Sequence, residues 1–282
     1  MPDLYITPEI EAILAIPDLV KIIHFSGGKD SECVLHALHK RSPTDDIRLA
    51  LADTGNEYED DPDGRWISAA NWCIQRSAHY GYPLTIVRNS KRTLQQEVVE
   101  RNRFPSSKER WCTSHHKRGP LEKYIRSLDA DHILSIKGIR ADESDQRAGK
   151  APWEQHLKLT VSKTRKTKRP RIVWNWLPIF YWTLDDVLTY VEDNEIPLHP
   201  AYAFQDRFSC EWCIFYGPKQ IAAMYDNNRQ AFDECHDLEL KTNFTLSPSR
   251  KFLPQIVEEY KASGKKWIPP TAIYTRRHNC DY

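Results

Sequence analysis

The hexapeptide at residues 26–31, SGGKDS, combines residue types that bind anions. Two consecutive glycines let the backbone turn sharply and approach a ligand closely, while the two serines and Lys29 supply hydroxyl donors and a cation. An apolar, β-branched run at 20–25 predicts a buried strand before it, and apolar side chains at helical spacing over 30–39 predict a helix after it. Free N–H groups and the helix dipole would favour negative charge there, so we predict an anion site; an ordinary Gly-Gly turn is the alternative.

A second group of residues with metal-binding chemistry is the cysteines. Cys210 and Cys213 form a C-x-x-C pair, whose thiolates can reach one metal centre from a tight loop. Aromatic and basic neighbours fit a shielded anionic cluster, and an inert buried pair is the alternative. Cys112 precedes two adjacent histidines, but zinc would need another close pair of ligands, and none lies nearby in the sequence.

Charged residues also follow two predicted strands. Residues 47–52 predict a buried strand that leads into Asp53, and residues 131–138 predict one that leads towards Arg140 and Arg147. In open α/β sheets the carboxyl ends of parallel strands face the ligand crevice. There Asp53 could hold a ribose hydroxyl or Mg²⁺, and the arginines could clamp phosphate or sulfate. The alternatives are a plain turn at Asp53 and a salt-bridged, solvated loop at the arginines.

These residues are positioned by elements that alternate along the chain, which predicts βαβ units and an α/β fold with a doubly wound, mostly parallel sheet. A further strand is predicted at 84–88, and further helices at 8–16, 65–80, 117–126, 183–191, 228–235 and 254–263. We expect a nucleotide-binding α/β domain at 1–200 and a C-terminal helical extension with the C-x-x-C pair at 201–282. Cys73 is expected to be a core residue of its helix.

Charge and composition narrow the classes of partner. The formal net charge is +1, so no global field steers the chain to nucleic acid, and any basic surface must be local. The one strong basic run, Lys163 to Arg171, is either a solvated loop or a contact to a phosphate backbone. No run is apolar enough to cross a bilayer, and the acidic N-terminus is unlike a secretory signal. Seven unevenly spaced cysteines indicate a reducing environment, so we expect a cytoplasmic protein without membrane contact.

The loop SGGKDS lacks the Walker pattern and resembles the PP-loop of ATP pyrophosphatases, which split ATP between its α- and β-phosphates. Over residues 22–219 the chain resembles the group of adenosine 5′-phosphosulfate and 3′-phosphoadenosine 5′-phosphosulfate (PAPS) reductases. The resemblance rests on motifs in the same order, SGGKDS at 26–31, DTG at 53–55, WC…KRGPL at 111–121, GIRADES at 138–144, WTLDDVLTY at 182–190 and CEWC at 210–213. Its intact loop and cysteine layout look most like the ATP-pyrophosphatase component of DNA phosphorothioation systems, and phage- and plasmid-borne relatives look alike.

The resemblance implies an adenine nucleotide α-hydrolase-like fold, and an enzyme that adenylates an acceptor for sulfur transfer, in nucleic-acid modification or defence. It implies ATP and Mg²⁺ as ligands, a sulfur donor protein as partner, and Lys29, Asp30 and Arg140 as catalytic residues. The implied nucleotide-binding residues are Ser26, Gly27, Gly28, Asp30, Ser31, Asp53 and Arg147. It also implies a 4Fe-4S cluster on three thiolates, Cys112, Cys210 and Cys213, with Cys235 as a candidate fourth ligand.

Three departures from the reductase pattern keep other functions open. PAPS reductases have a degenerate loop, whereas this one is intact and favours ATP. Cluster-bearing reductases have adjacent cysteines where this chain has Trp111 and Cys112, and their tail nucleophile matches Cys280 only weakly. A thiol-dependent sulfonucleotide reductase that uses Cys280 is therefore the first alternative. A non-catalytic nucleotide sensor or DNA-binding subunit is the second.

Overall fold

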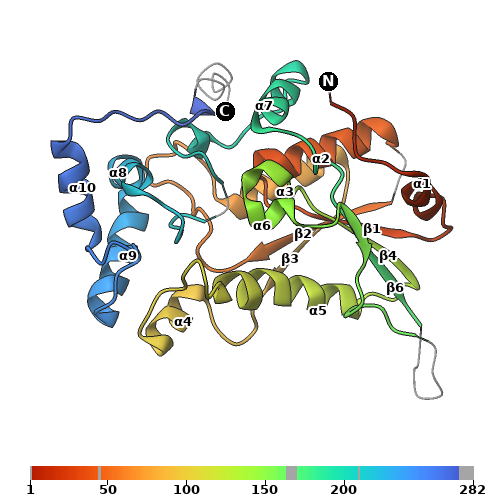
Figure 1. Cartoon of the computed structure of the whole chain (residues 1–282), viewed down its shortest axis with the longest axis horizontal. Helices are drawn as coiled ribbons and strands as arrows, with labels where there is room; N and C mark the ends of the chain where they lie inside the picture. Colours follow the sequence, from red (N-terminus) through yellow and green to blue (C-terminus); the bar gives the residue numbers. More distant parts are fainter. Residues whose placement is uncertain (1, 44–45, 163–169, 209, 273–282) are drawn as a thin grey trace. The chain divides into compact units, whose positions relative to one another are not determined.

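A computed structural model describes residues 2–43, 46–162, 170–208 and 210–272. Within them lies a six-stranded sheet with the strand order β3-β2-β1-β4-β6-β5 (Figure 1). β1 pairs in parallel with β2 and β4, β4 pairs in parallel with β6, and β5 is antiparallel to β6. The strands are β1 Val20–His24, β2 Ile47–Asp53, β3 Leu84–Arg88, β4 His132–Ile136, β5 Trp153–Gln155 and β6 Ile172–Trp176. The predicted α/β class with a mostly parallel sheet is confirmed.

Helices cover both faces of this sheet, with α5 on one side and α2, α3 and α7 on the other (Figure 1). The helices are α1 Pro8–Leu14, α2 Lys29–Arg41, α3 Ala69–Tyr80, α4 Leu94–Arg101, α5 Gly119–Ser127, α6 Asp145–Ala148, α7 Leu184–Asp193, α8 Pro218–Asn227, α9 Arg229–Thr242 and α10 Leu253–Ala262. The strand order reverses between β1 and β4. In open α/β sheets such a switch point, at the carboxyl ends of the strands, is where ligands bind.

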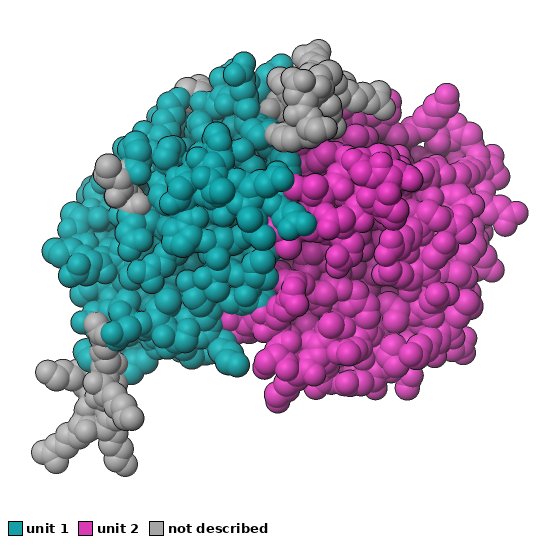
Figure 2. Space-filling model, turned by 180° about the vertical axis from the view of Figure 1, so that it is seen from behind, with its two compact units in different colours: residues 1–51, 71–87, 121–197 teal, residues 52–70, 88–120, 198–282 magenta. Residues whose placement is uncertain are grey.

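The chain folds as two compact units, each built from three separate segments (Figure 2). Unit 1 comprises residues 1–51, 71–87 and 121–197, and unit 2 comprises residues 52–70, 88–120 and 198–282. Unit 1 contains most of the sheet. Its central strand β1 is apolar on both faces, and Ile22 and Ile23 have no exposed surface, as expected for a parallel sheet between two helical layers.

Unit 2 has its own core, which is rich in aromatic side chains. Trp111, Trp212 and Phe232 pack there with apolar residues of α4, α8, α9 and α10. Glu239 of α9 is fully buried, and its carboxylate accepts hydrogen bonds from the backbone N–H groups of Leu246 (2.9 Å) and of Leu253, at the start of α10 (2.9 Å). Such bonds make a buried carboxylate tolerable and fix the path of the chain between the two helices. The domain boundary expected at residue 200 stays a prediction.

Most predicted elements occur with shifted ends, and five were missed. The helix predicted at 228–235 continues to Thr242, and the one predicted from 117 begins at Gly119 after a π-helical segment. The strands β5 and β6 and the helices α4, α6 and α8 were not predicted. None of the helices in the described residues has the length and apolar character needed to cross a lipid bilayer.

Candidate functional site

The predicted anion loop lies between β1 and α2 in unit 1. Gly27 has a positive φ of 71°, the left-handed conformation that favours glycine. Gly28 is the N-cap of α2, and no side chain caps this helix end. The carbonyl of Gly27 accepts a hydrogen bond from the Trp72 indole (3.2 Å), which fixes the turn. The first N–H groups of an α-helix have no partner within the helix, so this uncapped terminus can receive an anion.

The two hydroxyls of the loop lie side by side. Ser31 Oγ donates to the carbonyl of Gly28 (2.8 Å) and lies 3.4 Å from both Oγ and the backbone N of Ser26. These contacts hold the two ends of the hexapeptide together. The loop is therefore shaped before any ligand arrives, which lowers the entropy cost of binding.

Asp30 connects the loop to Arg140 through charge. Its carboxylate lies 3.2 Å from Lys29 Nζ and 2.6 Å from Arg140 Nε. Burial alone would raise the pKa of Asp30, but the charges of Lys29 and Arg140 outweigh burial and lower it. Arg140 is itself buried and also contacts Asp142 and the carbonyl of Trp182. The three residues predicted to be catalytic are thus brought together, with Asp30 orienting both cations.

A backbone contact joins the loop after β4 to the start of α2. A Cβ atom placed on Gly138 would lie 2.8 Å from the carbonyl oxygen of Asp30 and 3.1 Å from the backbone N of Ser31. Those distances are too short for any side chain, so only glycine allows this approach. Gly138 therefore lets the segment that carries Arg140 pack directly on the anion loop, at the switch point of the sheet.

The other two predicted binding residues have protein partners. Arg147 pairs with Glu143 of the same loop. Asp53, the last residue of β2 and part of unit 2, accepts a hydrogen bond from Gly55 N (2.8 Å) and pairs with Arg88 Nε (2.6 Å). Each would have to exchange its partner to contact a nucleotide, and their binding roles stay predictions.

In unit 2, Lys117 and the predicted cluster cysteines form what we call the cysteine centre. Lys117 Nζ donates to Cys210 Sγ at 3.1 Å. Burial works to lower the pKa of Lys117, but the negative charge of Cys210 and of Glu57 outweighs it, and the pKa is raised. Burial, followed by the charge of Cys210, raises the pKa of Cys112 and raises that of Cys213 to about 11. The three thiols therefore share one electrostatic neighbourhood, and Lys117 stabilises negative charge in it.

A π-helical segment, Cys112–Arg118, gives the cysteine centre its shape. Cys112 and Lys117 are five residues apart, which in an α-helix at about 100° per residue would place them about 140° apart around the axis. A π-helix bonds residues five apart and so brings such a pair to one side. Because π-helical turns are rare and cluster at functional sites, this segment supports a functional role for the centre.

The loop that carries Cys210 and Cys213 is held by hydrogen bonds from two residues, Asn56 and Tyr216. Asn56 donates from its side chain to the carbonyl of Trp212 (2.9 Å) and accepts from Glu211 N (2.9 Å). Tyr216 donates from its hydroxyl to the carbonyl of Cys210 (3.1 Å) and from its backbone N to that of Cys213 (2.8 Å). A loop held in this way keeps both thiols in place.

The donor set fits a metal cluster in its chemistry, with three half-buried thiols beside the half-buried cation of Lys117. Among the described residues, no three cysteine, histidine or carboxylate side chains are already drawn together with metal-ligand spacing. The cluster stays a prediction. Cys33, Cys73 and Cys235 are fully buried; Cys73 is the predicted core residue, and Cys235 lies in the apolar core of unit 2, where burial raises its pKa well above the usual range. Cys235 is thus poorly placed to supply a thiolate.

The two histidines after Cys112 bind a carboxylate, in keeping with the argument against a zinc site. His115 Nδ1 lies 2.9 Å and His116 Nε2 2.8 Å from the carboxylate of Glu97, which also accepts from Arg101 Nε (2.7 Å). Burial acts to raise the pKa of Glu97, but these hydrogen bonds outweigh it and lower the pKa to about 2. Glu97 therefore fixes the π-helical segment through hydrogen bonds to two of its side chains.

Two predicted features fall wholly or partly outside the described residues. Cys280 is one, and most of the basic run, residues 163–169, is the other. Arg171, at the end of that run, donates from Nη1 to the carbonyls of Ile125 (3.1 Å) and Arg126 (3.0 Å). It thereby caps the last turn of α5, so a contact from Arg171 to a phosphate backbone would require it to leave this helix.

Sequence reasoning missed three residues that belong to the cysteine centre or contact it. Lys117 was recognised only as part of the motif WC…KRGPL and as the start of a helix, and Glu57 and Tyr216 were not singled out. The carboxylate of Glu57 accepts from the backbone N (2.6 Å) and the hydroxyl (3.0 Å) of Thr54. Burial raises the pKa of Glu57 to about 7, against the opposing charge of Lys117. Its charge lies close to a lysine 60 residues away in the sequence, and no local pattern could have indicated that.

The structure is thus an α/β protein with the predicted anion loop at the switch point of its sheet. Residues 21–209 match the family model of the phosphoadenosine phosphosulfate reductase domain, and the chain belongs to this family.

Two relatives and two solved structures illustrate the similarity. An uncharacterised protein of Methanocaldococcus jannaschii is 31% identical over 193 residues, which cover 68% of this chain and 35% of that protein. An uncharacterised 37.8 kDa protein of Escherichia phage 186 is 27% identical over 135 residues, which cover 44% of this chain and 36% of that protein. The chain thus spans little more than a third of the length of these relatives. The U34-tRNA thiolase NcsA of Methanococcus maripaludis, solved with its 4Fe-4S cluster, has 18% identity and a TM-score of 0.45, with 90% of this chain and 75% of that one covered. The PAPS reductase of Candida auris has 15% identity and a TM-score of 0.42, with 67% and 78% covered.

Proposed function

We propose that this chain is a PP-loop ATP pyrophosphatase, which binds ATP–Mg²⁺ at Ser26–Ser31 and transfers AMP to an oxygen of an acceptor for later sulfur transfer. One observation carries the proposal. The intact hexapeptide is already shaped, with Asp30 holding Lys29 at 3.2 Å and Arg140 at 2.6 Å beside an uncapped helix N-terminus. This arrangement suits the charge of a triphosphate.

This reaction depends mainly on positioning the reactants and on stabilising the negative charge of the leaving pyrophosphate. An acceptor oxygen would attack the α-phosphorus, the bond from that phosphorus to the bridging oxygen would break, and pyrophosphate would leave with the negative charge. The N–H groups of α2, the two serine hydroxyls and Lys29 would stabilise that charge without reorganising. Asp30 would orient Lys29 and Arg140, and Asp53 would hold Mg²⁺ or the ribose after releasing Arg88.

We propose that the cysteine centre serves the sulfur step. Cys112, Cys210 and Cys213 would hold a 4Fe-4S cluster, and Lys117 would offset part of the charge of the three thiolates. When bound, such a cluster with three protein ligands offers an open iron that can bind sulfur. The sulfur, from a donor protein, would displace AMP from the adenylated acceptor. A nucleic acid is the acceptor class that we propose.

A single-turnover experiment tests the first step, with water as a slow acceptor and the anaerobically purified protein in excess over labelled ATP and Mg²⁺. AMP and pyrophosphate are the expected products. Lys29→Gln should slow their formation at least about tenfold, since removing one preorganised donor of charge stabilisation typically costs this much or more. Lys40→Gln, at the other end of the same helix, is the matched control and should leave the rate unchanged. ADP and orthophosphate as products, or equal rates in both variants, would contradict the proposal.

The family match favours one second candidate, a thiol-dependent sulfonucleotide reductase. That enzyme would release sulfite from PAPS or adenosine 5′-phosphosulfate with a dithiol as reductant. It would need no ATP cleavage, and Cys280 is its candidate nucleophile. Sulfite release that disappears in Cys280→Ser would establish this function in place of the first.

A further inference from the structure

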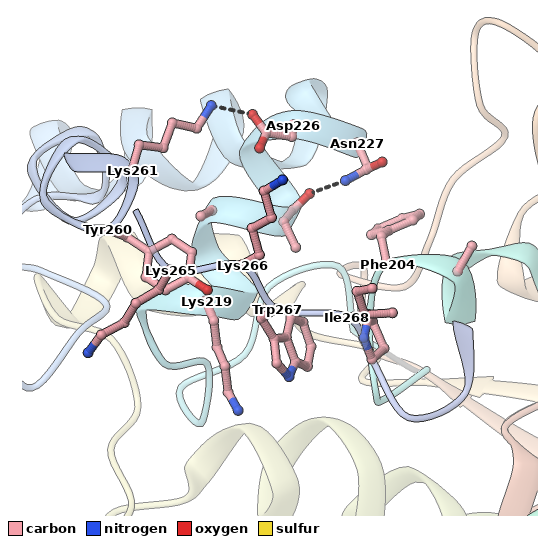
Figure 3. Close-up of a pocket in the computed structure, with 14 residues that line it drawn as sticks. Phe204, Lys219, Asp226, Asn227, Tyr260, Lys261, Lys265, Lys266, Trp267 and Ile268 are labelled. Carbon is pink, nitrogen blue, oxygen red and sulfur yellow. Dashed lines mark hydrogen bonds and ion pairs between the residues drawn. The ribbon is translucent and has the colours of Figure 1, made fainter. Parts of the chain in front are cut away.

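Unit 2 contains a pocket of about 390 Å³ that the proposed chemistry does not use. Its walls come from α8, from the end of α10 and from the segment that follows α10 (Figure 3). We call it the lysine pocket after four of its lining residues, Lys219, Lys261, Lys265 and Lys266.

The charge of the lysine pocket is largely uncompensated. Of its lining residues only Asp226 is acidic, and its carboxylate pairs with Lys261. Within the described part of the chain, Lys219, Lys265 and Lys266 have no carboxylate partner. The lining therefore carries a net charge of about +3. In a chain whose formal net charge is only +1, this is a local site for a polyanion.

Aromatic side chains lie among these lysines. Lys219 Nζ is 5.0 Å from the centre of the Trp267 ring, and Figure 3 shows the two side chains next to each other. Trp267 and Tyr260 are half-buried, so part of each ring faces the pocket. Cations that alternate with accessible rings are how proteins bind single-stranded nucleic acid, because phosphates meet the cations and bases stack on the rings.

The segment that carries Lys265, Lys266 and Trp267 is anchored at its far end. Two prolines follow at 269 and 270, which restrict the backbone. The Thr271 hydroxyl, fully buried, then donates to the carbonyl of Tyr202 (3.1 Å). Because the anchor is built in, the lysines and the indole are presented on a defined backbone, as a preorganised binding site requires.

We propose that the lysine pocket binds a single strand of nucleic acid, with phosphates on Lys219, Lys265 and Lys266 and a base stacked on Trp267. A base in a duplex has its faces covered by its neighbours and cannot reach the indole, so single strands should be preferred. This inference rests on the proposed function, because the strand bound in the lysine pocket would be the nucleic acid that presents the acceptor. DNA and RNA share the chemistry described here.

Fluorescence anisotropy with labelled 12-nucleotide single strands, one of DNA and one of RNA, tests the proposal on the whole chain without ATP. The triple variant K219Q/K265Q/K266Q removes the unpaired charges, and K108Q/K241Q, at exposed lysines outside the pocket, is the control. Each phosphate contact adds about 0.7 to the slope of log affinity against log salt for single strands. Raising the salt from 50 to 200 mM should therefore lower the affinity of the wild type about 20-fold more than that of the triple variant, because the wild type makes three more phosphate contacts.

Trp267→Leu should weaken binding about 5- to 150-fold, the range reported for loss of one base–aromatic stack, and Trp267→Phe should recover most of it. Unchanged slopes in the triple variant, a matched duplex binding as tightly as the single strand, or polyglutamate competing as well as the oligonucleotide would each overturn the proposal. The arm that binds more tightly identifies the strand as DNA or RNA.

ATP affinity, measured on the same proteins, separates this inference from the proposed function. The triple variant should bind ATP as the wild type does. A wild-type protein that releases pyrophosphate but does not bind the single strand would refute only the lysine pocket, whereas one that binds the strand but does not cleave ATP would refute only the pyrophosphatase.

Discussion

Gly138→Ala should separate the anion loop from the segment that carries Arg140. The added Cβ would lie 2.8 Å from the carbonyl oxygen of Asp30 and 2.9 Å from its carbonyl carbon, both backbone atoms that cannot rotate away. Ordinary contacts begin at 3.4 Å, so the two segments must move apart by about 0.6 Å (3.4 minus 2.8). The backbone of Gly138 does not have a positive φ, so alanine introduces only this steric change.

Overpacking of this size typically costs about 1–3 kcal/mol. If the cost is borne by the ligand-binding conformation of the loop, the Kd for ATP rises about 5- to 150-fold. Misplacement of Arg140 should slow AMP formation as well, because small displacements of positioning groups are costly in catalysis. Equilibrium binding of labelled ATP and the single-turnover assay measure the two effects.

Gly149→Ala is the matched control in the same unit. Its Cβ would meet only the carbonyl oxygen of Asp145, at 3.8 Å, which is an ordinary contact, and its φ is −77°. The control should bind ATP and cleave it as the wild type does. If Gly138→Ala and Gly149→Ala have the same ATP affinity and rate, the loop after β4 does not support the anion site and the reasoning fails.

Three further predictions concern unit 2. Cys210→Ser should abolish the iron and sulfide content of protein purified without air, whereas Cys73→Ser, in the core, should retain both. Glu97 has its pKa lowered to about 2 from 4.5, so it contributes about 3 kcal/mol of stability that is present above pH 4.5 and lost as the pH falls towards 2. In Glu97→Gln this loss should be absent and the protein less stable at neutral pH. The pKa of Glu57 is raised from 4.5 to about 7, so its contribution to stability depends on pH in the opposite sense. That contribution is present below pH 4.5 and is lost as the pH rises through 7. Glu57→Gln should therefore flatten the decline in stability over this range.

Elemental analysis checks the first of these, and zinc in place of iron would contradict it. Urea unfolding of the apoprotein, followed by tryptophan fluorescence from pH 2 to 8, checks the other two. The two glutamate variants serve as controls for each other, because the two carboxylates should change the stability with pH in opposite directions. Equal pH profiles in the Glu97→Gln and Glu57→Gln variants would show that neither carboxylate is perturbed as described.

The elements around the anion loop could be predicted because their patterns are local. The strands at 20–24 and 84–88 are short apolar runs, and Thr183 is a recognisable N-cap that does accept from Asp186 N. The strand β6 was missed because Asn175 interrupts its apolar run and Pro178 follows closely. Its pairing partner β4, about 40 residues earlier, makes it a strand, and a pairing at that distance leaves no local pattern.

The cysteine centre shows what lies beyond local patterns. The C-x-x-C spacing indicated that Cys210 and Cys213 work together. The spacing of Cys112 and Lys117 would have placed them on different sides of an α-helix, and only the π-helical backbone joins them. Glu57 reaches the centre through tertiary structure alone.

The division of each unit into three segments has a consequence for synthesis on the ribosome. Unit 1 has all its segments once residue 197 has been made, whereas unit 2 needs the residues from 198 onwards. Residues 52–70 and 88–120 therefore cannot complete unit 2 until α8, α9 and α10 have been synthesised. Until then the core of unit 2 does not cover Trp111 and Cys112. Domains made first generally fold first, so the sheet would form while the Cys112 thiol is still exposed to solvent. Loading of the proposed cluster would have to follow completion of unit 2, and until then the Cys112 thiol would be the cluster residue most open to oxidants.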